Sequence, residues 1–191
     1  MNIFFGTDGW RAHIDTEINQ ETVSVVAQAF ADFIHNNYKE EFPRVALAYD
    51  TRKNSQLFAT IFAEVLSGNH IEALLSDRIT PTPVLSYATL HTGCCAGVMI
   101  TASHNPPSYN GIKFKSRLGG PFNSDDTRKV ESYLYASPIK RSASNIHPMN
   151  FIPAYTEHIE KLIDFERIKK AGLHLLADSM GGAERFMGDA Y

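Results

Sequence analysis

Apolar residues alternate between helix-like and strand-like spacing over most of the chain. Positions such as Val23, Val26 and Phe30 recur at i, i+3 and i+7, which predicts a helix over 22–38. Further helices are predicted at 54–66, 84–90 and 124–135, and short continuous apolar runs predict buried strands at 45–49, 71–75 and 97–100. Alternating strands and helices are typical of an α/β domain with a mostly parallel sheet. We therefore expect a three-layer α/β/α arrangement with a mostly parallel mixed sheet.

The pattern changes after residue 137. Ser, Pro and Asn are frequent from Ser137 to Asn150, which predicts a linker. A helix over about 154–170, ended by Gly172, and a strand at 173–177 follow. One helix and one strand cannot close a core. We therefore expect a first domain at 1–137, a linker at 138–152 and an incomplete start of a second α/β domain at 153–191.

Composition narrows the class of protein. The chain has 191 residues, 43% hydrophobic and 20% charged, and a net charge of −3. These values are ordinary for a soluble globular protein, without the basic excess of a nucleic-acid-binding protein or an apolar run that would span a membrane. The N-terminus lacks the pattern of a signal peptide. Cys94 and Cys95 are adjacent and cannot staple a fold, so we expect reduced thiols and a cytoplasmic location.

Polar residues follow several of the predicted strands. Asp50-Thr51-Arg52, Thr80 to Pro83 and Thr101 to His104 each come directly after a strand. Parallel strands place such loops at one edge of the sheet, where ligands bind in open α/β folds. We therefore expect these three segments to converge on a site.

Ser103 is the candidate reactive residue at this edge. A serine hydroxyl acts as a nucleophile or carries a covalent group, and a simple turn built by Ser103 and His104 is an equal alternative. Ser103 has no Gly-x-Ser-x-Gly frame, and His104 is a poor base for it because adjacent side chains usually point apart. Lys113 is suited to general acid/base catalysis if burial or positive charge lowers its pKa. Arg11 lies beside a glycine-rich turn, and its planar guanidinium could bind phosphate there. The alternative is an N-terminal loop in which Arg11 is simply solvated.

Five ordered motifs resemble one known family. Thr101 to Pro106 resembles the active-site serine loop of the α-D-phosphohexomutases, which include phosphoglucomutase and phosphomannomutase. Tyr109 to Phe114 resembles the next motif of that family at the same spacing. The further matches are Phe5 to Arg11, Asp50 to Arg52 and Thr80 to Pro83. The resemblance covers the family's first domain and the start of its second.

The resemblance implies a phosphoserine mechanism. Ser103 would carry a phosphoryl group, donate it to a hexose phosphate to give a bisphosphate, and take back the other phosphate. Lys113 would be the general acid/base, and His104 would lie against substrate or phosphoserine. The resemblance further implies phosphate contacts from Arg11, Asn105 and Asn110, and structural support from Asp8, Asp50 and Arg52.

The resemblance also implies ligands and partners. Mg²⁺ would be bound by phosphorylated Ser103 and by an aspartate cluster of the second domain, and glucose 1,6-bisphosphate or its mannose analogue would be the activator. The substrate would be a hexose phosphate, with glucose or mannose favoured over glucosamine by Thr101. Neither nucleic acid nor a membrane is expected as a partner.

The sequence departs from the family pattern in its second half. It contains no Asp-Gly-Asp-Gly-Asp cluster, and Asp178 to Gly182 lacks the proline and histidine common in the family at the start of the second domain. Domains II–IV would have to act in cis or from another chain, and we expect little turnover from these residues alone. The alternatives are a non-catalytic remnant that binds phosphosugar or serves as an interaction module and, more weakly, a serine hydrolase.

Overall fold

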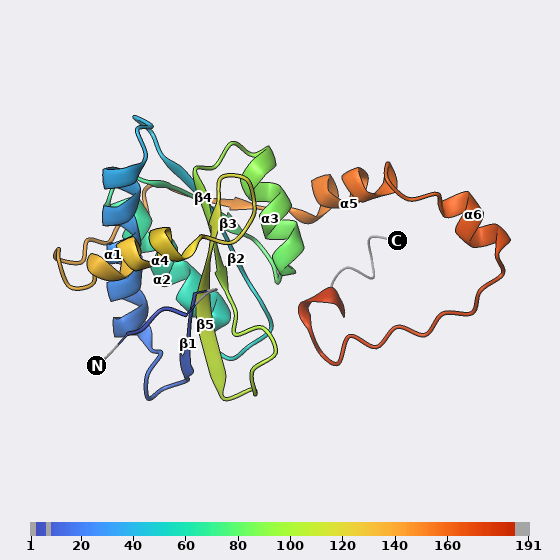
Figure 1. Ribbon diagram of the computed structural model, residues 1–191, viewed down its shortest axis with the longest axis horizontal. Coiled ribbons are helices and arrows are strands. Elements are labelled where there is room, and N and C mark those ends of the chain that lie inside the picture. Colours follow the sequence, from blue (N-terminus) through green and yellow to red (C-terminus); the bar gives the residue numbers. More distant parts are fainter. Residues whose placement is uncertain (1–2, 7–8, 186–191) are drawn as a thin grey trace.

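A six-stranded mixed sheet forms the centre of the protein. The computed structural model describes residues 3–6 and 9–185, and Figure 1 shows its elements. In the sheet the strands lie in the order β1-β5-β4-β2-β3-β6. Their bounds are Trp10–His13 (β1), Arg44–Tyr49 (β2), Glu72–Ser76 (β3), Ala96–Ile100 (β4), Tyr109–Ser116 (β5) and Ile146–Met149 (β6).

The direction of the strands places the candidate loops at one edge. Strands β4, β2, β3 and β6 are parallel, whereas β5 is antiparallel to both β4 and β1. Tyr49 at the end of β2 is in register with Ile100 at the end of β4, and the amide of Asp50 donates to the carbonyl of Ile100 at 3.2 Å. The segments after β2 and β4 therefore leave the sheet side by side.

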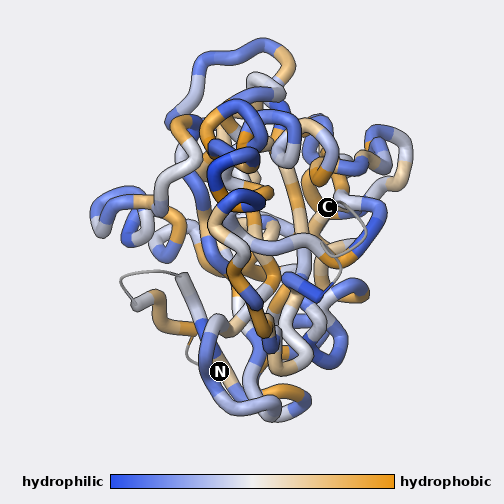
Figure 2. The backbone as a smooth tube through the Cα atoms, turned by 90° about the vertical axis from the view of Figure 1, so that its right-hand side faces the viewer, coloured by the Kyte–Doolittle hydropathy of each residue, from blue (hydrophilic) through white to orange (hydrophobic). Residues whose placement is uncertain are grey.

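Helices cover both faces of the sheet (Figure 1). Helices α1 (Gln20–Asn37), α2 (Ser55–Gly68) and α4 (Ser124–Ser132) lie on one face, where the side chain of Phe30 stacks on Phe114 of β5 at a centroid distance of 4.6 Å. Helix α3 (Thr82–His91) packs on the other face against β2 and β4, with Met99 and Leu85 in that core. Figure 2 shows hydrophobic stretches in the middle of the molecule and many hydrophilic segments around them. These layers confirm the predicted α/β fold.

Three strands of the sheet were absent from the sequence prediction: β5, which lies inside the sheet, and the two edge strands β1 and β6. β1 lies within and just after the segment interpreted as a glycine-rich turn, and β6 lies within the predicted linker 138–152. β6 pairs in parallel with β3, matching Ile146 to Ala73, so this part of the linker belongs to the first sheet. β1 and β6 have only four residues each and lie at the sheet edges, where long-range pairing rather than local pattern decides the conformation. The domain boundaries themselves stay a prediction.

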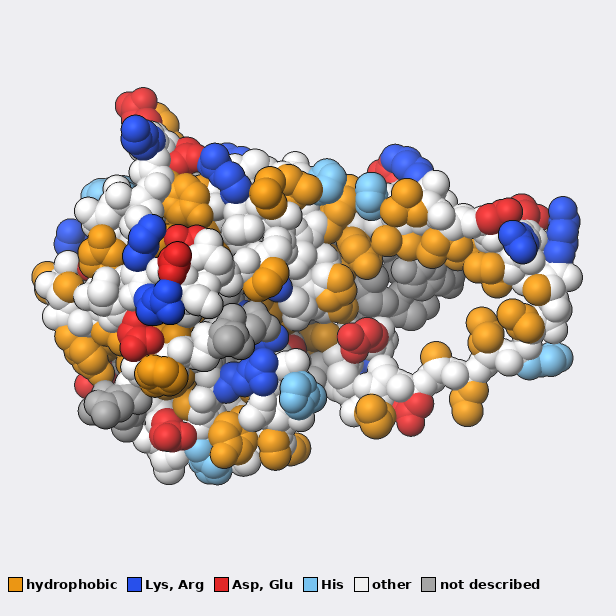
Figure 3. Space-filling model, in the orientation of Figure 1, with side chains coloured by type: hydrophobic (Ala, Val, Ile, Leu, Met, Phe, Trp, Pro, Cys, Tyr) orange, Lys and Arg blue, Asp and Glu red, His pale blue; other side chains and the backbone are white. Residues whose placement is uncertain are grey.

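The C-terminal part projects from the sheet as an arm, which we define as residues 151–185. Helix α5 (Ile152–Glu160) packs on α3, and α6 (Phe165–Lys170) follows after a break, so the single helix predicted for 154–170 is interrupted. The predicted strand at 173–177 is wrong, because this segment has no neighbouring strand to pair with among the described residues and is exposed. Figure 3 shows hydrophobic side chains distributed along the arm. In the described ranges, no helix has both the length and the apolar character needed to cross a membrane.

Candidate phosphoserine site

The loop after β4 presents Ser103 in an unusual backbone conformation. The amide of Asn105 donates to the carbonyl of Ala102 at 3.1 Å and closes a turn with Ser103 and His104 at its centre. Ser103 has φ 58° and His104 has no positive φ, a pattern that type II′ turns usually give to glycine. The amide of Ser103 donates to Oγ1 of Thr101 at 2.9 Å, and Ser103 itself is exposed. The hydroxyl is thus available at a point of backbone strain.

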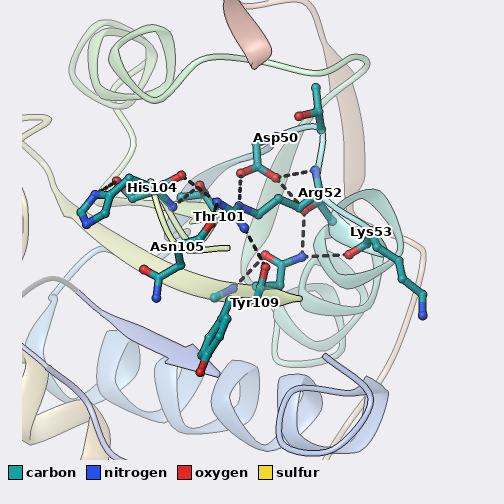
Figure 4. A network of polar contacts seen from close by, with 12 residues as sticks. Asp50, Arg52, Lys53, Thr101, His104, Asn105 and Tyr109 are labelled. Carbon is teal, nitrogen blue, oxygen red and sulfur yellow. Dashed lines mark hydrogen bonds and ion pairs between the residues drawn. The ribbon is translucent and has the colours of Figure 1, made fainter. Parts of the chain in front are cut away.

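Arg52 holds this loop from behind (Figure 4). Its Nη2 donates to the carbonyls of Ser103 at 2.8 Å and Asn105 at 2.7 Å, and its Nη1 donates to those of Pro106 and Tyr109, both at 2.9 Å. The side chain is only 13% exposed. One guanidinium therefore fixes four carbonyls of the serine loop, and its donors are committed to protein rather than to phosphate.

Asp50 orients the guanidinium. Its Oδ2 lies 3.4 Å from Nε of Arg52, while its Oδ1 accepts from the backbone amide of Arg52 at 2.9 Å. Oδ1 also accepts from the hydroxyl of Ser55 at 2.8 Å. These contacts are those of a supporting pair, the role that the sequence interpretation gave to Asp50 and Arg52.

Arg11 reaches the serine loop from the edge strand β1. Its Nη1 donates to Oδ1 of Asn105 at 3.0 Å, so two residues assigned to phosphate binding lie together beside Ser103. The approach of β1 requires glycine at two points. A Cβ on Gly9, which has φ +89°, would lie 2.1 Å from the carbonyl oxygen of Ile112, and one on Gly111 would lie 2.4 Å from that of Trp10. Asp8, expected as a supporting residue, lies outside the described residues.

His104 is exposed beside the serine. Its Nδ1 lies 3.5 Å from the hydroxyl oxygen of Ser103, at the outer limit of a hydrogen bond. In the described part of the chain no carboxylate bonds to the imidazole to orient it. This arrangement lacks the third member of a hydrolase triad and leaves His104 placed to contact a ligand.

Lys113 lies on β5 in register with Met99 of β4, and Met99 lines the cavity at Ser103. The lysine is 8% exposed and lies on the face of β5 that carries Lys115, which is equally buried. The structure therefore places the candidate acid/base next to the wall of the cavity.

Asn110, which was expected to bind phosphate, lies outside the cavity lining. Its side chain is fully buried, and its Nδ2 donates to the carbonyl of Lys53 at 3.0 Å and to Oγ of Ser55 at 2.9 Å. Its Oδ1 accepts from the amide of Gly111 at 2.8 Å. The alternation along β5 turns this side chain toward α2 rather than toward the pocket, which the motif alone does not reveal.

A cavity of about 720 Å³ opens at Ser103. Its walls come from the segments after β2 and β4, the start of α3 and residues 179–184 of the arm. The hydroxyl of Thr51 donates to the carbonyl of Gly181 at 3.1 Å, so the arm returns to the sheet edge at this point. Convergence of 50–52, 80–83 and 101–104 at one edge is therefore confirmed. Glu184 was missed as a lining residue because only its place in the fold brings it here.

The acidic residues at the cavity wall are Asp50 and Glu184. Within residues 3–6 and 9–185, no three His, Cys, Asp or Glu side chains are grouped to hold a metal ion. Asp50 is already bonded to Arg52 and Ser55. The described residues alone therefore do not fit a magnesium site.

Comparison with known proteins agrees with this geometry. Residues 2–138 match the model of a family described as "Phosphoglucomutase/phosphomannomutase, alpha/beta/alpha domain I". The chain belongs to this family. It is 40% identical to a phosphoglucomutase of Staphylococcus epidermidis over 133 residues, which is 68% of this chain and 24% of that protein. It is 33% identical to a phosphoglucomutase of Staphylococcus aureus over 192 residues, 93% of this chain and 34% of the relative.

Solved structures extend the comparison. A protein of Thermus thermophilus assigned as a phosphomannomutase superposes with a TM-score of 0.77 at 31% identity, covering 86% of this chain and 37% of that one. The open form of parafusin from Paramecium gives a TM-score of 0.79 at 17% identity over 96% of this chain and 41% of its own, a likeness of fold alone. The chain thus spans about a quarter to a third of the length of the curated relatives it matches.

Proposed function

We propose that this chain carries the phosphoryl-transfer serine of a phosphohexomutase, which interconverts hexose 1-phosphate and hexose 6-phosphate of glucose or mannose. The observation that supports this most directly is the exposed hydroxyl of Ser103 at the mouth of the cavity, on a loop fixed by Arg52. Phosphoryl transfer depends on positioning and on positive charge near the transferred group. Membership of the family supplies the reaction class.

In the proposed cycle, phosphorylated Ser103 gives its phosphoryl group to a hydroxyl of the hexose phosphate. The bond between Oγ and phosphorus breaks, the new sugar O–P bond forms, and the hydroxyl proton passes through the neutral amine of Lys113 to the departing Oγ. The bisphosphate then turns around, Oγ of Ser103 takes the other phosphoryl group, and its hydroxyl proton passes through Lys113 to the departing sugar oxygen. Arg11 and Asn105 would hold the loop, and His104 would contact the bound sugar phosphate.

A divalent cation belongs to this proposal as a separate requirement. Mg²⁺ would neutralise the phosphate on Ser103, which carries nearly two negative charges. The described residues do not complete a site for it, so further ligands and domains II–IV would be needed for full turnover. We therefore expect uptake of phosphate by this chain to be easier to observe than mutase turnover.

The free, buried thiols of Cys94 and Cys95 suit a reducing compartment, and a cytoplasmic location stays a prediction on that ground.

The proposal is tested by phosphate uptake. The 191-residue chain is incubated with Mg²⁺ and either glucose 1,6-bisphosphate or mannose 1,6-bisphosphate, and its intact mass is followed. We expect one added phosphate, absent in Ser103→Ala and retained in Ser108→Ala, which removes another exposed serine of the same loop. Failure of the wild-type chain to take up phosphate, or uptake by Ser103→Ala, would overturn the assigned carrier. Sugar-phosphate binding without transfer would favour the phosphosugar-binding module.

A further inference from the structure

A buried chain of hydrogen bonds leads from β5 to the serine loop through the start of α2. Asn110 donates to Oγ of Ser55 at 2.9 Å, and Ser55 donates to Oδ1 of Asp50 at 2.8 Å. Asp50 in turn pairs with Arg52, whose guanidinium holds the carbonyl of Ser103 at 2.8 Å. Figure 4 shows this network of polar contacts behind the loop. Neither Ser55 nor Asn110 lines the loop surface, since both side chains are fully buried.

Every side-chain hydrogen-bond donor of these two residues is used, and the side-chain oxygen of each accepts one bond. The single hydroxyl proton of Ser55 goes to Asp50, and its oxygen accepts from Asn110. Both amide protons of Asn110 are donated, to Ser55 and to the carbonyl of Lys53, and its oxygen accepts from Gly111. A buried polar network in which every member is satisfied fixes one arrangement of its side chains.

Removal of the Ser55 hydroxyl would affect Ser103 through the contacts of Asp50 with Arg52. The carboxylate oxygen Oδ1 would keep only the backbone amide of Arg52 as a donor. The remaining contact of the other oxygen, Oδ2 to Nε of Arg52, is 3.4 Å, the longest link of the chain. The carboxylate would then be free to rotate, and the guanidinium that spans four loop carbonyls would lose its orientation.

The backbone conformation of Ser103 depends on the orientation of the Arg52 guanidinium. A φ of 58° is unfavourable for a residue with a Cβ, so it persists only where the surroundings enforce it. Arg52 supplies that constraint at the carbonyl of Ser103 itself.

We propose that Ser55 and Asn110 are positioning residues that hold Ser103 in its left-handed conformation through Asp50 and Arg52. The proposal rests on the phosphoryl-carrier function of Ser103 for its catalytic consequence. Ser103 lines the cavity, and a small displacement of its attacking oxygen would lower the transfer rate steeply.

The chain offers a matched control for each residue. Ser67 is a buried serine at the opposite end of α2 whose Oγ accepts from the amide of Asn145 at 3.0 Å. Asn69 is a buried amide that exchanges hydrogen bonds with Gln28, at 2.9 and 3.0 Å. Ser67→Ala and Asn69→Ala therefore remove comparable buried hydrogen bonds without touching the network behind Ser103.

Two readouts separate positioning from stability. The first is the backbone amide chemical shifts of Ser103 and His104, with the φ-dependent coupling of Ser103, measured by NMR on the 191-residue chain without ligand. The second is the rate of phosphate uptake from glucose 1,6-bisphosphate with Mg²⁺. We expect Ser55→Ala and Asn110→Ala to shift the loop amides and to slow uptake by roughly 10-fold to 100-fold, whereas the two control variants do neither.

Unchanged loop amides and coupling in Ser55→Ala, or uptake as fast as in Ser67→Ala, would overturn the proposal. If the wild-type chain takes up no phosphate, the proposed function fails, and the NMR readout still decides whether Ser55 positions Ser103. If Ser55→Ala does not fold, Ser55→Cys keeps the volume of the side chain while replacing the hydroxyl by a weak donor, and the same two outcomes apply.

Discussion

The guanidinium of Arg52 donates a hydrogen bond from Nη2 to the carbonyl of Ser103 at 2.8 Å, across the 51 positions that separate the two residues in sequence. The same nitrogen donates to the carbonyl of Asn105 at 2.7 Å. Arg52 and Ser103 both line the cavity. The contact thus connects the end of β2 to the chemistry proposed after β4.

Replacing Arg52 by lysine is expected to weaken both the fold and the site. An ammonium cannot reach four carbonyls from one position, and hydrogen bonds to charged groups contribute about 1.5–3 kcal/mol each. We expect Arg52→Lys to lower the free energy of unfolding by roughly 2–4 kcal/mol, measured by urea denaturation. Phosphate uptake by Ser103 should slow by about 10-fold or more.

The control for this substitution is Arg78→Lys, because Arg78 forms an exposed pair with Asp77 on the surface. We expect little change in stability or uptake there. Equal changes in unfolding free energy and phosphate uptake in the two variants would show that Arg52 does not fix the serine loop.

The positive φ of Ser103 leads to a prediction about the stability of its variants. Glycine adopts φ 58° without a steric cost, because it has no Cβ. Alanine has a Cβ and retains that cost. Ser103→Gly should therefore be more stable than Ser103→Ala by about 1 kcal/mol, measured by urea denaturation. At Ser108, which has no positive φ, the order should reverse, with alanine the more stable replacement. The same order at both positions would argue against the left-handed conformation.

The sequence predicted the parts of the site that depend on strand ends. The segments after β2 and β4 were placed at one edge because parallel strands must end together, and Asp50 and Ser103 are found there. The direction of a side chain on its strand was beyond the pattern, so the burial of Asn110 against α2 was not predicted. Ser55 lies at the start of the helix predicted over 54–66 and was given no role in the site, since its bond to Asp50 depends on how α2 packs.

Edge strands show the same limit. β1 and β6 are too short for a clear period, and β6 contains Pro148, a residue typical of edge strands. Conversely, Leu173 to Ala177 has the apolar character of a strand and forms none, because no partner strand is available among the described residues. Local pattern thus predicted β2, β3 and β4, while pairing decided the edge strands.

Lys113 and Lys115 allow a test of the acid/base role. Both lie on one face of β5 and are equally buried, so replacement by methionine should alter the stability of the two variants alike. We expect Lys113→Met to slow phosphate uptake by roughly 100-fold, the scale of general acid/base catalysis, and Lys115→Met to leave it nearly unchanged. A time course of intact mass measures the rate of phosphate uptake in each variant. Uptake by Lys113→Met at the wild-type rate would remove this residue from the mechanism.

The arm should exchange its amide hydrogens faster than the sheet. Helix α6 has no buried residue, and α5 buries only Ile152 and Thr156. Few apolar contacts then oppose local opening. Hydrogen exchange followed by mass spectrometry should show rapid labelling of 161–180 and strong protection of β2 and β4. Equal protection of both regions by the isolated chain would contradict the prediction.

The buried thiols of Cys94 and Cys95 should make the stability of the fold depend on pH in the alkaline range. Burial raises the pKa of the Cys94 thiol to about 11 and that of the Cys95 thiol to about 12. The two side chains lie in opposite hydrophobic cores of the sheet, so they cannot form a disulfide with each other without rearrangement. In the unfolded chain both thiols ionise at an ordinary pKa of about 8.5. Between this value and the folded pKa, the native state therefore holds more protons than the unfolded state.

The sign of the effect follows from this difference. The stabilisation is complete below about pH 8.5 and is lost as the pH rises through the folded values, so the free energy of unfolding should fall from about pH 8.5 up to the folded values of about 11 and about 12. Urea denaturation at several pH values measures the slope, which should be shallower in a Cys94→Ala, Cys95→Ala double variant. At about pH 8 the folded protein should resist iodoacetamide and react only after unfolding, because the buried thiols remain protonated. Rapid alkylation of the folded chain, or an unchanged slope in the double variant, would show that the two thiols are not held neutral in these cores.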